Sequence, residues 1–228
     1  MENKYTFDDF LDIVKRLRGE NGCEWDRAQT HETLTKYLIE ESYEYIEATL
    51  NKEPQKQMDE LGDVLLQVVM NAQIAKEKGD FDINDVVNAV SKKMVYRHPH
   101  VFSDVTVSGV DDILKNWEDL KKKEQNIKKD KDILLSVSKA LPALVRAQKV
   151  IEKIEKIEKN KKIKSFNEES IDKFDNLLDN IREQVDISHK NKIFGEALIA
   201  LIYLASKEGI SVEMCLNESI DQLIDRFN

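Results

Sequence analysis

The sequence predicts an all-α protein, and two observations lead to this prediction. Gly and Pro are scarce, at 7 and 3 in 228 residues, whereas charged residues make up 35% of the chain and hydrophobic residues 41%. This composition suits long amphipathic helices better than a β fold, whose turns need Gly and Pro. Apolar residues also recur every three or four positions in most segments, which is the spacing of one helix face.

The first helix is expected to begin after Thr6 and to run to about Arg18. Thr6 is a suitable N-cap, and Asp9 lies in the first turn. The inward face consists of apolar residues at helical spacing, namely Phe7, Phe10, Leu11, Val14 and Leu17.

A loop from Gly19 to Asp26 is expected next. It contains Trp25, which could stack on a planar ligand or cover the core, and both interpretations stay open. Cys23 is interpreted as a small buried hydrophobic residue, because no His or Lys adjoins it to activate the thiol.

Two long helices form the centre of the predicted fold. They are expected over Thr30 to Leu50 and over Gln55 to Lys78, and Gly79 closes the second as a helix C-terminal glycine. Because the connection is short, the two helices should pack antiparallel. Their middle turns are rich in apolar residues that are expected to be packed, namely Tyr37, Leu38, Tyr45, Leu61, Val64, Leu65 and Val68.

Five of the acids on these two helices stand out by their spacing. Residues three or four apart share a helix face, so Glu41 and Glu44 point the same way, Glu40 lies beside Glu44, and Glu60 lines up with Asp63. Like charges about 5 Å apart repel by roughly 3 kcal/mol per pair at an effective dielectric of 20, against a net stability of about 5–15 kcal/mol. The acids therefore indicate a bound cation.

Oxygen-only ligands favour a hard ion, Mg²⁺ first and Mn²⁺ second. Such a site usually completes the metal's coordination with water and substrate phosphate. The alternative is that these acids form a solvated helix face, because charged residues are mostly exposed. The apolar residues in the same turns argue against that alternative for the set as a whole.

Gly62 interrupts the second acidic helix between Glu60 and Asp63. A Gly inside a helix costs about 1 kcal/mol relative to Ala. Its position suggests close approach of the partner helix or of a phosphate group, with chance as the competing explanation.

A fourth helix should begin at Asp82 or Asn84 and end before Pro99. Its inward residues are expected to be Val86, Val87, Val90 and Met94. Its last turns carry the cations that could hold a phosphate tail, namely Lys92, Lys93 and Arg97. His98 and His100 do not suffice for zinc, which usually needs three or four ligands.

A charged helix is expected from about Asp111 to Lys129, and the lysine-rich run from Lys121 to Lys131 is interpreted as a solvated linker. From Leu141 a second helical region begins. Its first helix carries a narrow apolar stripe and two expected i,i+4 ion pairs, Glu152 with Lys156 and Glu155 with Lys159.

Three further helices are expected to complete this region. The first follows a capping-box pattern over Ser165 to Glu168, the second runs from Ile193 to Glu208 and ends at Gly209, and the third is capped by Ser211. The inward residues of the last helix should be Leu216, Ile220, Leu223, Ile224 and Phe227.

Four elements of the sequence together carry a resemblance to a known family. An acidic signature, EExxE followed by ExxD, is present as Glu40-Glu41-Ser42-Tyr43-Glu44 and Glu60-Leu61-Gly62-Asp63. A GCPWD and QTH pattern is present as Gly22-Cys23-Glu24-Trp25-Asp26 and Gln29-Thr30-His31, with Glu24 where Pro is usual. An RRHPHVF pattern is present as Arg97-His98-Pro99-His100-Val101-Phe102. The run from Leu141 to Lys149 is similar to the start of the family's second helical module. In this order the elements resemble the MazG family of all-α nucleoside triphosphate pyrophosphohydrolases.

The resemblance implies a hydrolase that converts a nucleoside triphosphate to the monophosphate and diphosphate. The implied ligands of Mg²⁺, or of Mn²⁺, are Glu41, Glu44, Glu60 and Asp63. A metal held there would bridge phosphate oxygens and neutralise charge on the leaving diphosphate. Glu40 faces partly away, so it is the catalytic candidate that orients or deprotonates the attacking water.

The resemblance also implies substrate contacts and partners. Lys56, Lys93 and Arg97 match family positions that contact phosphate. Trp25 is the candidate to bind the base for a different reason, because aromatic residues are enriched in ligand pockets. Family members are dimers or higher oligomers, so a homodimer is expected.

Two MazG-like helical bundle modules with antiparallel helices are expected, over residues 1–132 and 133–228. In the second, the family's acidic positions are occupied by Asp175, Asn176, Asp179, Ile193 and Glu196. Because Ile cannot ligate Mg²⁺, this module is interpreted as degenerate, and catalysis is assigned to the first.

Several other functions are disfavoured. The net charge of −9 argues against a general nucleic-acid binder. No N-terminal apolar run has the length of a signal or membrane span, and the two cysteines lie far apart, so a cytoplasmic protein is expected. A di-iron bundle would need paired Glu-x-x-His motifs, which are not present. A non-catalytic structural or regulatory helical protein of the same fold is the remaining alternative.

Overall fold

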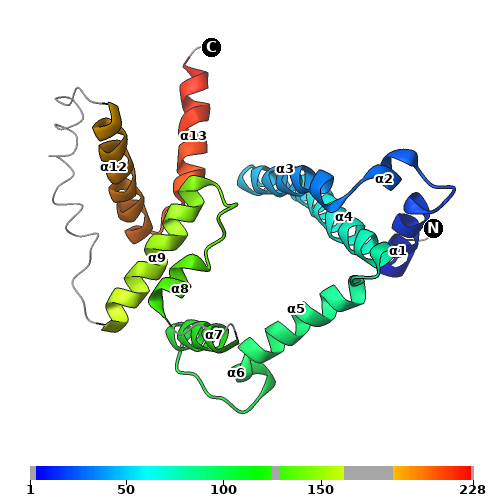
Figure 1. Ribbon diagram of the computed structural model, residues 1–228, viewed down its shortest axis with the longest axis horizontal. Helices are drawn as coiled ribbons and strands as arrows, with labels where there is room; N and C mark the ends of the chain where they lie inside the picture. Colours follow the sequence, from blue (N-terminus) through cyan, green and yellow to red (C-terminus); the bar gives the residue numbers. More distant parts are fainter. Residues whose placement is uncertain (1–3, 125–128, 162–186, 227–228) are drawn as a thin grey trace. The chain divides into compact units, whose positions relative to one another are not determined.

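The computed structural model describes residues 4–124, 129–161 and 187–226, and this part of the chain contains α-helices and no strand (Figure 1). The predicted all-α class is thereby confirmed. The helices are α1 (Phe7–Arg18), α2 (Glu24–Ala28), α3 (His31–Leu50), α4 (Pro54–Lys78), α5 (Ile83–Arg97), α6 (Pro99–Phe102), α7 (Val110–Glu124), α8 (Asp130–Leu135), α9 (Ala143–Lys161), α12 (Ile187–Lys207) and α13 (Val212–Asp225). Among the described residues, no helix is both long and apolar enough to cross a membrane.

The chain divides into two compact units, Met1–Trp117 and Glu118–Asn228. In the first unit, α3 and α4 form the antiparallel pair that the short connection predicts, and α1 packs on α4. The buried core of this unit consists of Val14, Leu34, Val69, Met70 and Ile74. The acid-bearing helices are therefore held by a hydrophobic core at the end where α1 crosses them.

Local hydrogen bonds set the helix ends of the first unit where the sequence predicts them. Thr6, Thr30 and Asp82 each form a reciprocal capping box at the start of a helix. Gly79 ends α4 with φ of +78°, a left-handed conformation that favours Gly. Pro54 lies in the first turn of α4, where its missing N–H costs nothing.

The predicted loop from Gly19 to Asp26 is wrong in its second half, because residues 24–28 form the short helix α2. The turn before α2 is very tight. A Cβ atom on Gly22 would lie 2.1 Å from the backbone oxygen of Leu17, so only Gly fits there. Cys23 is exposed at the N-cap of α2, which corrects its interpretation as a buried residue.

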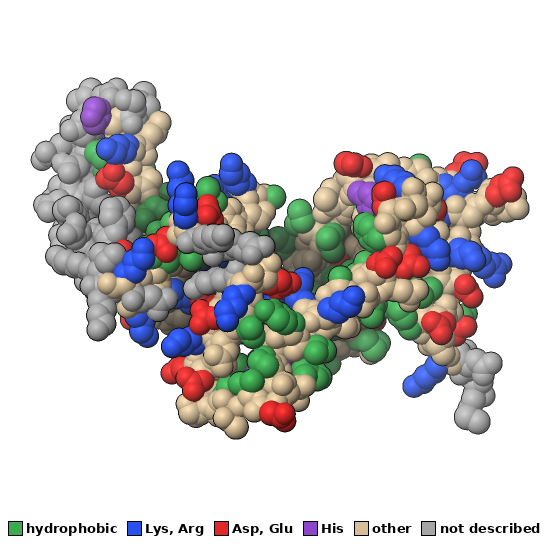
Figure 2. All heavy atoms as spheres, turned by 60° about the horizontal axis from the view of Figure 1, so that its bottom comes forward, with side chains coloured by type: hydrophobic (Ala, Val, Ile, Leu, Met, Phe, Trp, Pro, Cys, Tyr) green, Lys and Arg blue, Asp and Glu red, His purple; other side chains and the backbone are tan. Residues whose placement is uncertain are grey.

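The prediction that the apolar faces of α3, α4 and α5 are packed is wrong at several positions. Exposed apolar side chains on α3 and α4 include Leu38, Leu61, Leu65 and Val68, and those on α5 include Val87, Val90 and Met94. The reason is that α5 contributes Ile83 to the core and then diverges from α4 (Figure 1). No further layer of the first unit covers these faces, and apolar side chains are visible at the molecular surface (Figure 2).

Gly62 is not explained by close approach of α3. A Cβ atom at this position would meet no atom within 4 Å. Close packing of α3 is therefore not the reason for this Gly, and the proximity of a phosphate stays a hypothesis, with chance as the competing explanation.

In the second unit, α9 and α12 pack around Ile151, Ile202 and Tyr203. The side chain of Gln148 connects α9 to the start of α13, where its Nε2 donates to the Ile210 carbonyl at 2.9 Å and its Oε1 accepts from the Val212 N–H at 3.3 Å. This bond pair fixes the turn between α12 and α13.

The lysine-rich run from Lys121 to Lys131 is not simply a linker, since α7 extends to Glu124 and α8 begins at Asp130. Acids of these helices pair with lysines of α9, Glu118 with Lys156 and Asp130 with Lys161.

The two predicted i,i+4 pairs of α9 are also wrong. Lys156 bonds Glu118, and Glu155 pairs with Lys207 of α12 at 3.4 Å. These charges join neighbouring helices and do not stabilise one helix alone.

The end of the second unit differs from expectation in two ways. Helix α12 begins at Ile187, six residues before the predicted start at Ile193. On α13 the residues expected inward are exposed, namely Leu216, Ile220, Leu223 and Ile224. The expected helix after Ser165 to Glu168, the acids at Asp175 and Asp179 with Asn176, and Phe227 lie outside the described residues.

Candidate functional site

Three of the predicted acids meet on the α3–α4 pair. Glu41 of α3 and Glu60 and Asp63 of α4 each offer one carboxylate oxygen, and these oxygens all lie within 4.8 Å of one another. Helical spacing places Glu60 and Asp63 on one side of α4, and the antiparallel register brings Glu41 opposite them. We call these three residues the acidic cluster.

The register of the two helices is fixed by polar contacts on both sides of the cluster. Lys56 Nζ lies 3.2 Å from the Glu47 carboxylate near the α3–α4 turn. At the other end, His31 Nδ1 lies 2.8 Å from Asn71 Oδ1. A slip of one residue would break both contacts, so they keep the acids opposite one another.

The acidic cluster is electrostatically strained without a cation. Burial raises the pKa of Glu41 above its usual value, and the charges of Asp63 and Glu44 raise it further. Burial is also the largest cause of the raised pKa of Glu60, followed by the charge of Glu44. Glu60 is only 8% exposed, so water screens its charge poorly.

The other two predicted acids lie at the edge of the cluster. Glu44 is close enough to Glu60 to raise its pKa both by its charge and through a hydrogen bond between the side chains. Glu40 is exposed, and its charge contributes to the raised pKa of Glu41. Glu44 is therefore near Glu60 but is not one of the three acids whose oxygens lie within 4.8 Å of one another, and Glu40 is exposed to water.

The predicted cations are distributed differently from the acids. Lys56 lies beside the cluster, and its pKa is raised first by its hydrogen bond to Glu47 and in part by the charge of Glu60. Lys93 is exposed on α5. Arg97 is 7% exposed, and its guanidinium lies 5.2 Å from the centre of the Trp117 ring. Because α5 diverges from α4, its C-terminal end does not lie beside the α3–α4 pair in the single chain (Figure 1).

Trp25 lies on α2 and is 53% exposed, so it does not act as a buried lid on the core. Its ring contacts that of Tyr37 edge to face, with a centroid distance of 5.9 Å and an interplanar angle of 66°. Tyr37 precedes Glu41 by about one turn on α3. An accessible aromatic pair is thus positioned about one turn from the acidic cluster.

Sequence reasoning missed a polar layer between the acidic cluster and the core. Gln67 follows Asp63 by four residues, is 7% exposed, and its Oε1 atom has no hydrogen-bond partner. Asn71 Nδ2 donates to the Gln67 carbonyl at 2.8 Å, so its Oδ1 faces His31 as an acceptor. His31 Nδ1 is therefore the donor of that bond. The four-residue spacing of Asp63, Gln67 and Asn71 was a signal that could have found this layer.

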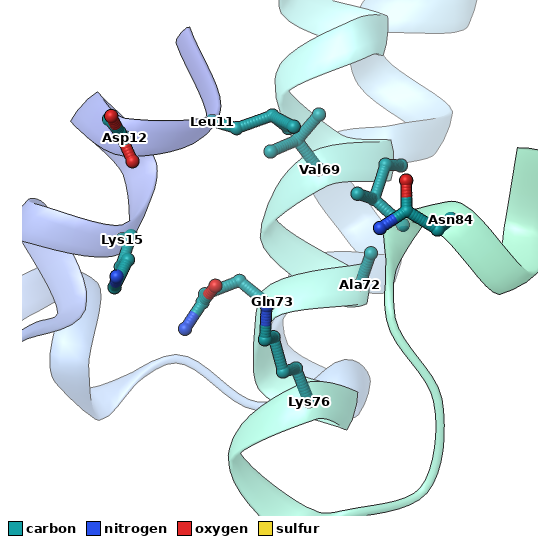
Figure 3. A pocket seen from close by; sticks show the side chains of 9 residues that line it. Leu11, Asp12, Lys15, Val69, Ala72, Gln73, Lys76 and Asn84 are labelled. Atoms are coloured by element: carbon teal, nitrogen blue, oxygen red, sulfur yellow. The ribbon is translucent and has the colours of Figure 1, made fainter. Parts of the chain in front are cut away.

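A separate pocket of about 180 Å³ lies between α1, α4 and the start of α5 (Figure 3). It has an apolar wall that includes Leu11 and Val69, and Lys15 and Lys76 lie at its rim. None of the predicted site residues lines it.

The second unit has no comparable arrangement among its described residues. Ile193 is half-buried, and Glu196 lies 3.8 Å from Lys192 in an i,i+4 ion pair on the surface of α12. Glu196 is thus paired with a cation of its own helix.

Comparison with known proteins gives one family and several relatives. The family model described as the MazG nucleotide pyrophosphohydrolase domain matches residues 29–102, which include the whole acidic cluster. A Thermotoga maritima protein named nucleoside triphosphate pyrophosphohydrolase/pyrophosphatase MazG is 37% identical over 221 residues, covering 97% of this chain and 84% of that protein. An Escherichia coli protein named nucleoside triphosphate pyrophosphohydrolase is 34% identical over 223 residues, covering 96% of this chain and 85% of that protein.

A third relative has a different length. The Bacillus subtilis protein named uncharacterized protein YabN is 50% identical over 146 residues. The match covers 64% of this chain but only 30% of that protein.

Proposed function

The chain belongs to the MazG family of nucleotide pyrophosphohydrolases, and from this we propose that it hydrolyses a nucleoside triphosphate to the monophosphate and diphosphate. The observation that carries the proposal is the acidic cluster, which lies inside the family match on two antiparallel helices. Relatives whose names state this activity cover nearly the whole chain.

The donor set of the cluster fits Mg²⁺, with Mn²⁺ as a second choice. All candidate ligands are carboxylate oxygens, which are hard donors, and the pKa values of Glu41 and Glu60 are raised first by burial and then by the neighbouring acids, so a cation would offset the cost of ionising them. We assign Glu41, Glu60 and Asp63 as ligands, with Glu44 as the fourth. Bound Mg²⁺ would supply Lewis-acid stabilisation of the phosphate charge.

The remaining roles fall to side chains around the cluster. Glu40 is exposed next to Glu41 and can orient or deprotonate the attacking water. Lys56 holds phosphate oxygens beside Glu60. Trp25 stacks on the base, because this residue is half exposed and its ring contacts Tyr37, which precedes Glu41 by about one turn of α3.

We also assign Lys93 and Arg97 to the triphosphate. Because the end of α5 lies away from α3 and α4 in one chain, these contacts require a movement of α5 or a second subunit.

A homodimer is supported by a row of exposed apolar side chains on α4. Met58, Leu61, Leu65 and Val68 follow helical spacing and are 37–60% exposed. An apolar stripe of this kind beside a functional site is typical of a subunit interface. The stripe runs past Gly62 and the acidic cluster, so the partner would lie next to the substrate.

The dimer is tested by the mass in solution. Light scattering after gel filtration should give about twice 26.5 kDa for the native chain. Leu65→Glu should shift the measured mass toward that of the monomer, because the substitution places a charge in the buried interface. Ile13→Glu is the matched control and should leave the mass unchanged. Ile13 lies on α1 and is 38% exposed, compared with 40% for Leu65. A native chain that is monomeric at all concentrations would reject the proposal.

We assign catalysis to a module over residues 1–132 and interpret residues 133–228 as a degenerate module. This assignment is supported by the contrast between the acidic cluster and the second unit, where Ile193 offers no ligand and Glu196 is paired with Lys192. The degenerate module would then serve the stability or assembly of the protein.

The products test the proposed reaction. Attack at the α phosphate releases diphosphate in a single step, so ion chromatography should show monophosphate and diphosphate in equal amounts from the first turnover. Sequential release of orthophosphate would indicate a different phosphohydrolase. No turnover of any nucleoside triphosphate in the presence of Mg²⁺ or Mn²⁺ would favour the structural or regulatory alternative.

A further inference from the structure

We propose that Arg18 is a positioning residue that fixes α2, and with it the Trp25 ring that receives the substrate's base. The proposal rests on the proposed function for its consequence in catalysis, but not for its structural part. The hydrogen bonds of Arg18 go to Glu77 and to the backbone of Asp26 and Gln29, not to the acidic cluster or to the Trp25 ring.

Helix α2 cannot hold its own position. It has five residues, fewer than an isolated helix needs to be stable in water. Its N-cap, Cys23, makes no side-chain capping bond. The Asp26 carbonyl of its last turn accepts from the Gln29 N–H at 3.2 Å, but this bond is local, so α2 needs further donors from other helices to hold it in place.

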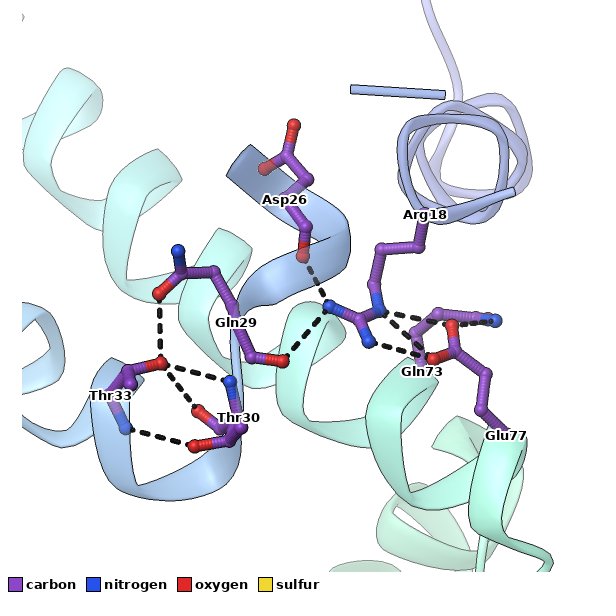
Figure 4. Close-up of polar contacts among 7 residues, drawn as sticks. All are labelled: Arg18, Asp26, Gln29, Thr30, Thr33, Gln73 and Glu77. Carbon is purple, nitrogen blue, oxygen red and sulfur yellow. Dashed lines mark hydrogen bonds and ion pairs between the residues drawn. The ribbon is translucent and has the colours of Figure 1, made fainter. Parts of the chain in front are cut away.

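Arg18 supplies these donors (Figure 4). Its Nη1 donates to the backbone oxygens of Asp26 and Gln29, the latter at 3.3 Å. On its other side, Nε lies 3.0 Å and Nη2 2.7 Å from carboxylate oxygens of Glu77 on α4. The Arg18 side chain is only 6% exposed, and all three of its guanidinium nitrogens donate in these contacts. This bonding lowers the pKa of Glu77, which keeps the pair ionised.

Gln29 extends the connection to Trp25. Its Nε2 donates to the Trp25 carbonyl at 2.9 Å, and its Oε1 accepts from Thr33 Oγ1 at 2.8 Å. Thr33 belongs to the capping box that starts α3. The backbone of Trp25 is thus tied through Gln29 to α3 and through Arg18 to α4, the two helices that carry the acids (Figure 4).

This network sets the distance between the aromatic ring and the acidic cluster. Arg18 and Glu77 are 59 residues apart in the chain, so their bond locks α1, α2 and the end of α4 as one body. If the Arg18 contacts are lost, the C-terminal end of α2 loses its attachment to α1 and α4, and the Trp25 ring moves relative to Glu41. A base held by that ring would then be misplaced while the acids keep their arrangement.

The kinetics of the native protein, two single variants and their double variant test this consequence. Arg18→Lys keeps the charge but removes the planar fork that reaches Glu77 and two carbonyls at once. We expect it to raise KM about tenfold and to change kcat less than threefold, because the acids are not displaced. Trp25→Ala should raise KM by a similar factor. The double variant should match Trp25→Ala alone, since Arg18 acts through that ring.

Two variants complete the kinetic test. Arg27→Lys is the matched control, because Arg27 lies on the same helix but is exposed and donates to the Glu20 carbonyl, so KM should stay within twofold. Glu77→Gln keeps the size of the acceptor and should shift KM in the same direction as Arg18→Lys, which tests the proposal even if Arg18→Lys does not fold. Multiplicative effects of Arg18→Lys and Trp25→Ala, or a loss confined to kcat, would overturn the proposal.

A second measurement does not depend on activity. In a Trp117→Phe background, Trp25 is the single remaining tryptophan, and its fluorescence anisotropy reports how firmly α2 is held. Arg18→Lys should lower the anisotropy and Arg27→Lys should not. An unchanged anisotropy overturns the proposal. A lowered anisotropy in a protein that hydrolyses no triphosphate would reject the proposed function and leave the positioning of α2 by Arg18 supported.

Discussion

Replacing Asp63 by Asn is expected to lower kcat about 10³-fold or more while the protein stays folded. Asn keeps the size and polarity of the side chain but removes one charge from the acidic cluster. Losing a metal ligand should cost several kcal/mol of transition-state stabilisation, and each 1.36 kcal/mol is tenfold in rate. The melting temperature should stay equal or rise, because repulsion with Glu41 and Glu60 falls.

The matched control is Glu196→Gln in the second unit. Glu196 is the residue predicted for the corresponding family position, but it pairs with Lys192 on the surface, so turnover should stay within about twofold. Both variants are assayed with the same triphosphate, and circular dichroism verifies the fold. If Glu196→Gln lost activity while Asp63→Asn kept it, the assignment of the two modules would be reversed.

Removal of divalent metal should abolish hydrolysis, and addition of Mg²⁺ should raise the melting temperature. A ligand that binds only the folded state stabilises it by about 2.7 kcal/mol at 100 times its Kd, which corresponds to roughly 5–10 °C for a chain of this size. Excess EDTA is used for the first measurement and calorimetry for the second. Turnover that persists in excess EDTA would contradict the assignment of the cluster as a metal site.

The effect of Mg²⁺ on stability should depend on pH, with a defined sign. The folded-state pKa values of Glu41 and Glu60 are raised above 4.5, so the metal-free folded state keeps protons that the unfolded state has lost. The contribution of Glu41 and Glu60 to the unfolding free energy of the metal-free protein therefore falls as the pH rises from about 4.5 through their raised pKa values. The increase in melting temperature on adding Mg²⁺ should be larger at pH 7 than at pH 5. The Asp63→Asn variant should show a smaller increase on adding Mg²⁺ than the native protein.

Comparison of sequence and structure shows which kinds of prediction succeed. The start of α1 was predicted from Thr6 as an N-cap, that of α3 at Thr30 and that of α5 at Asp82 or Asn84, and the structure shows a capping box at Thr6, Thr30 and Asp82, a hydrogen-bond pattern between residues three apart. The acidic faces were predicted as well, since Glu60 and Asp63 share a helix face whatever the rest of the fold does. The short α3–α4 connection then left the antiparallel pair as the expected arrangement.

Predictions about burial failed more often. Leu65, Val90 and Ile220 all follow helical apolar spacing, yet each is exposed in the single chain. Periodicity identifies an apolar face of a helix, but it does not say which element covers that face. In α5 the helix leaves α4 after its first turn, so its apolar face has no partner within the first unit.

By itself, the sequence determined the all-α class, the ends of the central helices and the acids that share a face, because these depend on composition and on contacts within one or two helical turns. Only the tertiary structure decided that Glu41 meets Glu60 and Asp63, that α2 is a helix and that Arg18 holds it against Glu77. The physical reason is that these features need hydrogen bonds and charge contacts between residues distant in the chain. Such pairs form only when a shared hydrophobic core brings their helices together.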